Sequence, residues 1–93
     1  MKKTRVRIEV RGIVQGVGFR YHAQRKAMET GLQGFVRNTY DGSVIIEAEG
    51  SDDAIDRFCH WCRQGPPRAQ VRHFRKEDID LLHDEGFRIL PTI

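Results

Sequence analysis

The sequence is short of cysteine and has no long apolar stretch, and each shortage excludes a class of protein. Its longest unbroken apolar run is Val44-Ile45-Ile46, whereas a membrane-spanning helix needs about 18 apolar residues. Met1–Thr4 lead into alternating charges instead of the apolar segment of a signal peptide. Two cysteines, Cys59 and Cys62, are too few and too close for a disulfide framework. We therefore expect a cytoplasmic protein with no membrane partner.

The length and composition predict one folded domain. Of the 93 residues, 39% are hydrophobic, and the net charge is only +3. A chain this apolar and this close to neutral is not expected to be disordered. A chain this short holds one hydrophobic core. We therefore expect residues 1–93 to form a single domain and, by default, a monomer.

The charge is unevenly distributed along the chain. Residues 1–40 hold nine Lys/Arg against two Asp/Glu, a balance of +7, and residues 41–93 have a balance of −4. A basic half attracts nucleic acid, an anionic membrane or a small anionic substrate, and charge alone does not choose among these partners. The choice depends on particular residues.

Hydrophobic periodicity predicts the elements of the first half. Val6, Ile8 and Val10 alternate with charged residues, which is typical of a half-buried strand over Arg5–Arg11. Three glycines interrupt any period over Gly12–Gly18, which predicts a loop. A stripe of Phe19, Ala23 and Ala27 then predicts a helix over Phe19–Thr30, with Gly31 as its left-handed C-terminal cap. The next elements are a strand over Leu32–Thr39, a hairpin turn at Asp41-Gly42 and a strand over Val44–Glu49.

The second half begins with a helix that Ser51 caps and that runs to Gln64. Its apolar stripe has helical spacing and consists of Ile55, Phe58, Cys59 and Cys62. Gly65-Pro66-Pro67 ends this helix. The remaining elements are a strand over Ala69–Arg75, a charged irregular connection over Lys76–Glu85 and a short edge strand over Phe87–Leu90.

The order β-α-β-β-α-β predicts an α+β, ferredoxin-like fold, with two helices packed on one face of an antiparallel sheet. A right-handed crossover makes the first two strands parallel and inserts the third between them. The loop over Gly12–Gly18 and the end of the second strand, at Arg37-Asn38, should then lie on the same rim of the sheet.

One segment on that rim has the features of an anion site: Gln15-Gly16-Val17-Gly18-Phe19-Arg20. Its glycines let successive backbone N–H groups turn inward, and the helix that follows adds unpaired donors at its positive end. Arg20, in the first turn, opposes the helix dipole but is placed to close a bidentate fork on a bound phosphate. The same glycines also suit a tight connection without any ligand, and a glycine loop alone is a weak motif.

Asn38 supplies a second polar group on this rim. Its amide both accepts and donates hydrogen bonds, so it suits a water held in line with a bound phosphorus, where a carboxylate would repel the dianion. Asn is also common at the start of a turn. Taken together, the two groups favour phosphoryl transfer by positioning and charge stabilisation.

These segments resemble a known family. Gly12-Ile13-Val14-Gln15-Gly16-Val17-Gly18-Phe19-Arg20 resembles the signature of the acylphosphatases, Phe35-Val36-Arg37-Asn38 with Asp41-Gly42 resembles the second motif, and Gly65-Pro66-Pro67-Arg68-Ala69 with Val71 resembles a later segment. The resemblance implies hydrolysis of an acyl phosphate to a carboxylate and inorganic phosphate, with no metal and no cofactor. It implies that Arg20 binds the phosphate and that Asn38 orients the water. The basic excess is then interpreted as a field that draws a small dianion to this rim, with Arg37 adding to it and Arg5, Arg7 and Arg11 on the outer strand face.

The cysteine pair and His22 are the other candidates for a functional role. Cys59-His60-Trp61-Cys62 suggests a metal or redox site, but the pair lies in a helix body and zinc would need two further ligands, so we expect core packing. His22, the histidine nearest the loop, is expected on the flank of its helix.

Two alternatives to catalysis remain. A ferredoxin-like nucleic-acid-binding module would suit the basic half, but such domains stack bases on aromatic residues of the third strand, and Val44–Glu49 has none. The other alternative is a non-catalytic acylphosphatase-like domain, and a similar signature occurs in hydrogenase-maturation carbamoyl-transfer proteins. Those proteins are far longer, and we expect a free-standing enzyme without a nucleic-acid partner.

Overall fold

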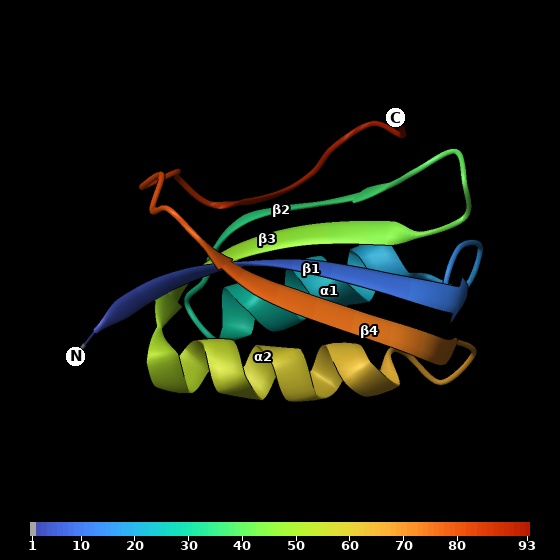
Figure 1. The fold of residues 1–93 in the computed structure, drawn as a ribbon, viewed down its shortest axis with the longest axis horizontal. Coiled ribbons are helices and arrows are strands. Elements are labelled where there is room, and N and C mark those ends of the chain that lie inside the picture. The colour runs from blue at the N-terminus through green and yellow to red at the C-terminus, as the bar shows by residue number, and fades with distance from the viewer. Residues whose placement is uncertain (1) are drawn as a thin grey trace.

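The computed structural model describes residues 2–93 and contains two helices and five strands in the predicted order (Figure 1). The elements are β1 (Lys3–Ile13), α1 (Phe19–Glu29), β2 (Gln33–Asn38), β3 (Val44–Ser51), α2 (Asp52–Gln64), β4 (Gln70–Ile79) and β5 (Phe87–Ile89).

The strands form one sheet in the order β4-β1-β3-β2-β5, and both helices cover the same face of it (Figure 1). The first four strands pair antiparallel with their neighbours, as predicted for a ferredoxin-like fold. The short fifth strand is also confirmed, but β5 pairs parallel with β2. The sheet is therefore mixed, because the connection after β4 crosses the sheet and returns the chain in the direction of β2.

The core lies between the helices and the sheet. Alternate residues of β1, with Val6, Ile8 and Val10 fully buried, face the predicted apolar stripes of both helices. The predicted caps are also confirmed. Ser51 accepts a hydrogen bond from the N–H of Ala54 at the start of α2, and Gly31, after α1, has a left-handed φ of 73°. Burial of these apolar side chains is the main force that holds the two layers together.

Three strands are longer than periodicity predicts. β3 continues from Glu49 to Ser51, because Gly50 and Ser51 pair with β1. β1 continues to Ile13, because Gly12 and Ile13 pair with β4 after a register shift at Arg11. β4 continues to Ile79 through residues assigned to an irregular connection. Its backbone pairs with β1 along this stretch, and charged side chains are well tolerated on an exposed edge strand.

A buried ion cluster lies on the sheet face that has no helices, and it corrects the expectation that Arg5 is available on an outer face. The Arg5 side chain is 1% exposed and contacts three carboxylates. Its nitrogens lie 2.8 Å from Glu47, 3.2 Å from Glu49 and 2.6 Å from Asp84. The charge of Arg5 is therefore paired inside the fold and does not contribute to the surface.

The same cluster fastens the connection between β4 and β5 to the sheet. The backbone N–H groups of Leu82 and His83 donate to the Glu49 carboxylate, at 2.8 Å and 3.0 Å. Burial alone would raise the pKa of Glu49, but these donors and Arg5 outweigh it and hold the pKa below its ordinary value. Residues far apart in the sequence are therefore tied together by charge.

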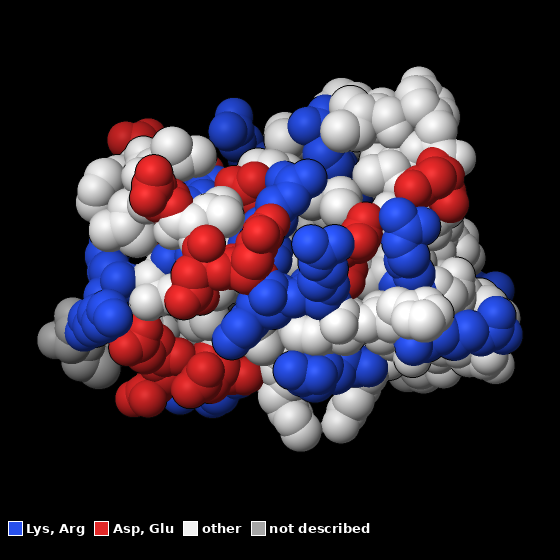
Figure 2. Space-filling model, in the orientation of Figure 1, with Lys and Arg blue, Asp and Glu red and all other residues white. Residues whose placement is uncertain are grey.

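The other two arginines of β1 are also paired with acidic side chains. Arg7 pairs with Glu47, and Arg11 pairs with Glu9 and Asp41. On the face drawn in Figure 2, acidic and basic side chains are interspersed. Pairing thus neutralises the three arginines of β1, and the field expected from them is correspondingly weakened.

Candidate active site

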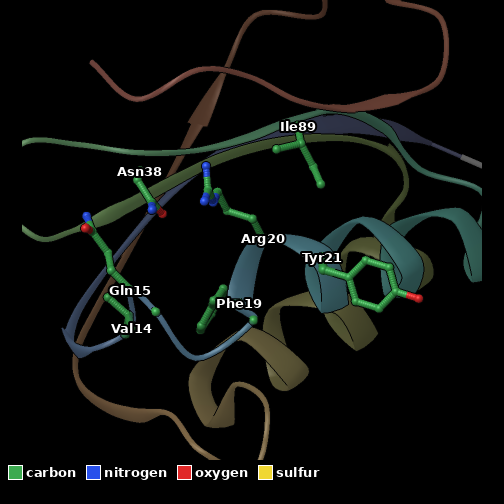
Figure 3. Close-up of a pocket in the computed structure, with 9 residues that line it drawn as sticks. Val14, Gln15, Phe19, Arg20, Tyr21, Asn38 and Ile89 are labelled. Carbon is green, nitrogen blue, oxygen red and sulfur yellow. The ribbon is translucent and has the colours of Figure 1, made fainter.

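A pocket of about 270 Å³ lies at the rim where β1 and β2 both end (Figure 3). Seven of its nine lining residues belong to the segment between β1 and the first turn of α1, from Val14 to Tyr21. The other two are Asn38, at the end of β2, and Ile89, at the end of β5. The topology therefore brings together Arg20 and Asn38, as the sequence predicted.

The loop before α1 has the backbone geometry of an anion-binding nest. Gly16 has a φ of 74° and Gly18 a φ of 80°, and a side chain at Gly18 would also press on His22, whose Cδ2 would lie 3.3 Å from the added Cβ. Gly18 is the N-cap of α1 and provides no side-chain cap. The first N–H groups of the helix therefore remain free to donate to an anion, at the positive end of the helix dipole.

Arg20 extends from the first turn of α1 toward Asn38 (Figure 3). Unlike the arginines of β1, its half-buried guanidinium has no salt bridge or side-chain hydrogen bond within residues 2–93. Within this part of the chain, the pocket lining also includes no Asp, Glu or His. The pocket thus has one positive side chain with five free donors and nothing to repel a phosphate dianion.

Asn38 is held by β3 on one side and by the C-terminal segment after β5 on the other. Its side chain is 9% exposed, and its Oδ1 is buried without a hydrogen-bond partner in the described chain. Its backbone carbonyl accepts from the N–H of Ile93 at 3.1 Å. A buried acceptor without a partner is costly, so this oxygen is suited to accept a hydrogen bond from a group that enters the pocket.

The Gln15 side chain has a structural contact within the fold. Its Nε2 donates to the backbone carbonyls of Thr39 and Ser43, both at 2.8 Å, and thereby ties the loop to the β2–β3 hairpin. Phe19 is 2% exposed and packs on Trp61, with 5.3 Å between ring centroids. Val17 packs against the core, outside the pocket lining. The side chains of Phe19 and Val17 therefore contribute to the core, whereas that of Gln15 holds the loop in place.

Sequence reasoning missed three lining residues and misplaced one charge. Val14, Tyr21 and Ile89 line the pocket but were not predicted there. Arg37 faces the opposite side of the sheet from Asn38, since side chains alternate along a strand, and its Nε donates to the carbonyl of Pro91 at 3.1 Å. Ile89 is 41% exposed at the sheet edge, which nothing in the local sequence of β5 indicates.

The remaining candidate residues lie elsewhere. Cys59 and Cys62 are buried in the core, as predicted, and burial raises the pKa of the Cys62 thiol well above its ordinary value. Across residues 2–93 no group of three or more His, Cys, Asp or Glu side chains is arranged to hold a metal ion. His22 is exposed on the flank of α1. The two helices of this region are each too short or too polar to cross a membrane.

Comparison with known proteins identifies the family of the chain. The acylphosphatase family model matches residues 6–89. An acylphosphatase from Mannheimia succiniciproducens is 52% identical over 77 residues, which cover 83% of this chain and 86% of that protein. The crystal structure of acylphosphatase from Bacillus subtilis superposes with a TM-score of 0.91 at 37% identity, covering 96% of this chain and 99% of that one.

A longer protein contains a similar unit. HypF from T. kodakarensis superposes with a TM-score of 0.83 at 33% identity, and the match covers 99% of this chain but only 12% of that one. The chain spans most of the length of the acylphosphatases themselves. These matches select an enzyme over a nucleic-acid-binding module. The chain therefore belongs to the acylphosphatase family of hydrolases.

Proposed function

We propose that the pocket binds the phosphoryl group of an acyl phosphate and hydrolyses the bond between phosphorus and the acyl oxygen. In this mechanism the loop from Gln15 to Phe19 contributes backbone N–H donors, and Arg20 closes on the phosphate with a bidentate fork. The observation that carries the proposal is an arginine without an acidic partner beside an uncapped helix N-terminus, in one pocket with a buried, unpartnered amide oxygen. These are the donors that an oxyanion with delocalised charge requires.

Asn38 orients the attacking water. Its Oδ1 accepts a hydrogen bond from the water and fixes the oxygen lone pair toward phosphorus, while its neutral amide does not repel the dianion. The arrangement contributes by positioning, because no covalent intermediate is needed. Asn38 is held in place by the pairing of β2 with β3 and by the hydrogen bond from Ile93.

The reaction balances without a protein base. A bond forms between the water oxygen and phosphorus, and the bond to the acyl oxygen breaks with its electron pair, which leaves on the carboxylate. Both water protons stay on the inorganic phosphate. Since the lining side chains from residues 2–93 include no carboxylate or imidazole, the phosphate oxygens of the substrate are the natural proton acceptors. A carboxylate is a good leaving group, so no strong general acid is required.

Arg20→Ala and Asn38→Ala test these roles with benzoyl phosphate as substrate. Loss of one preorganised donor typically lowers the rate by about 10² to 10³, and we expect at least that loss in each variant. Arg57→Ala, which removes an exposed arginine on α2 outside the pocket, is the matched control and should keep wild-type turnover. A folded Arg20 or Asn38 variant with near-normal turnover would remove that residue from the mechanism.

We further propose that residues 1–93 work as one cytoplasmic, monomeric unit. Both helices and the sheet contribute to one hydrophobic cluster, which supports a single cooperative fold. The two free cysteines fit a reducing compartment.

A further inference from the structure

The pocket continues past Arg20 along an apolar flank that phosphate chemistry does not use. Two of its lining residues, Tyr21 and Ile89, are 54% and 41% exposed, although both carry large apolar surfaces. Ile89 contrasts with Phe87, two residues earlier on the same strand face, which is buried and lies 6.0 Å from Phe58 between ring centroids. The last residue of β5 thus presents its side chain at the pocket instead of filling the core.

The sheet register fixes the distance of this flank from the proposed water site. Ile89 pairs with Val36 in the parallel β2–β5 ladder, and Asn38 is two residues further along β2 on the same face. With strands about 4.8 Å apart and a rise of about 3.3 Å per residue, the two Cα atoms are about 8 Å apart. Ile89 and Asn38 are therefore close enough to contact opposite ends of the same small substrate.

Figure 3 shows how the side chains are arranged around this distance. The guanidinium of Arg20 lies between Asn38 and Ile89, and Ile89 points toward α1, between Arg20 and Tyr21. The Tyr21 ring lies on the side of Arg20 remote from Asn38, with the guanidinium of Arg25 5.8 Å from its centroid. The apolar flank is thus opposite the water site, across the proposed phosphate position.

The geometry of in-line displacement relates this apolar flank to the leaving group of the reaction. If water attacks phosphorus from the side of Asn38, the acyl oxygen must leave from the opposite side. Resting on the proposed function, we propose that Ile89 and Tyr21 form the subsite for the acyl group of the substrate. The subsite favours acyl phosphates with an apolar or aromatic acyl group, because such a group buries the exposed surfaces of both residues.

The solvent exposure of the flank sets the expected strength of the preference for an apolar acyl group. A single methylene in an enclosed hydrophobic pocket discriminates by about 10- to 200-fold. The Ile89 side chain is 41% exposed, so we expect the lower end of that range. Truncation at Ile89 should therefore reduce kcat/KM for a large apolar substrate about tenfold and leave a small substrate within about twofold.

The test compares benzoyl phosphate with acetyl phosphate on wild type, Ile89→Ala, Ile89→Leu and Tyr21→Ala. We expect the ratio of kcat/KM values for benzoyl over acetyl phosphate to fall about tenfold in Ile89→Ala. The ratio should fall in the same direction in Tyr21→Ala and be retained in Ile89→Leu, which keeps the apolar volume. Met28→Ala, another exposed apolar residue on α1 but outside the pocket, is the matched control and should not change the ratio.

The outcomes separate this subsite from the proposed function. Wild type that hydrolyses neither substrate contradicts the proposed function. Variants that keep the wild-type ratio, or that lose both activities equally, overturn the subsite while leaving the phosphate site in place. If Ile89→Ala does not fold, Tyr21→Ala decides alone, because its ring is on the exposed surface of a helix.

Discussion

The side chain of Gln15 provides the sharpest test of how the two halves of the site are held together. Its Nε2 bridges the carbonyls of Thr39 and Ser43, so Gln15→Ala removes two hydrogen bonds and adds no charge. Neither carbonyl becomes an orphan: that of Thr39 still accepts from Gly42, and that of Ser43 still accepts from the N–H of Thr39. The change therefore removes a tether between the loop and the hairpin without leaving a buried acceptor unpaired.

The magnitude follows from those two bonds. Each is worth about 1 kcal/mol net, so the free energy of unfolding should fall by about 2 kcal/mol. The same tether fixes the loop donors relative to Asn38. If the whole amount were lost from alignment in the transition state, the rate would fall by at most about 30-fold, since about 1.36 kcal/mol corresponds to tenfold. We expect a 10- to 30-fold loss in kcat/KM, measured with acetyl phosphate alongside urea unfolding.

A matched variant makes the outcome decisive. Gln24→Ala removes one bond of the same kind, from Nε2 to the carbonyl of Phe87 at 2.8 Å, at the junction of α1 with β5. It should cost about 1 kcal/mol of stability and leave acetyl phosphate turnover within about twofold of wild type. The reasoning is refuted if Gln15→Ala loses stability but keeps full turnover, or if both variants lose turnover equally.

Two further predictions concern the whole fold. Folding lowers the pKa of Glu49, so the stabilisation by this carboxylate is complete above its ordinary pKa of 4.5 and is lost as the pH falls through the lower folded value. The free energy of unfolding should therefore fall with acidification in this range. The pH profile of the free energy of unfolding should be flatter for Glu49→Gln. A wild-type-like slope in that variant would show that other carboxylates dominate. For the proposed single unit, light scattering should give a monomer mass and circular dichroism one unfolding transition, and a second transition or a dimer mass would contradict it.

The fold was predictable where a short stretch carries its own signal. The alternation of Val6, Ile8 and Val10, and the helical stripe that includes Phe58, each identify an element and its buried face locally. The direction of β5 was not predictable, because a three-residue strand contains no information on its partner. The end of β4 was missed for a similar reason: backbone pairing with β1 sustains it through a charged stretch that has no clean period.

The polar residues of the site could be predicted from the sequence, but its apolar residues and the ion pairing of Arg5 could not. Arg20 and Asn38 could be placed together because the crossover rule brings the ends of β1 and β2 to one rim. The fate of Arg5 could not be predicted, since its three acidic partners are 42, 44 and 79 residues away in the sequence. Ile89 also depends on long-range pairing, because only its register with β2 puts it beside the pocket.

β5 is the last element of the chain and lies at the edge of the sheet, apart in sequence from the loop and from Asn38. The phosphate-facing residues lie within residues 14–38, whereas the apolar flank ends on a strand that is fastened by Asp84 on one side and by the bond from Leu90 to Val36 on the other. Under the proposed assignment, substitutions at the end of β5 would alter the preferred acyl group without disturbing the residues proposed to bind the phosphoryl group.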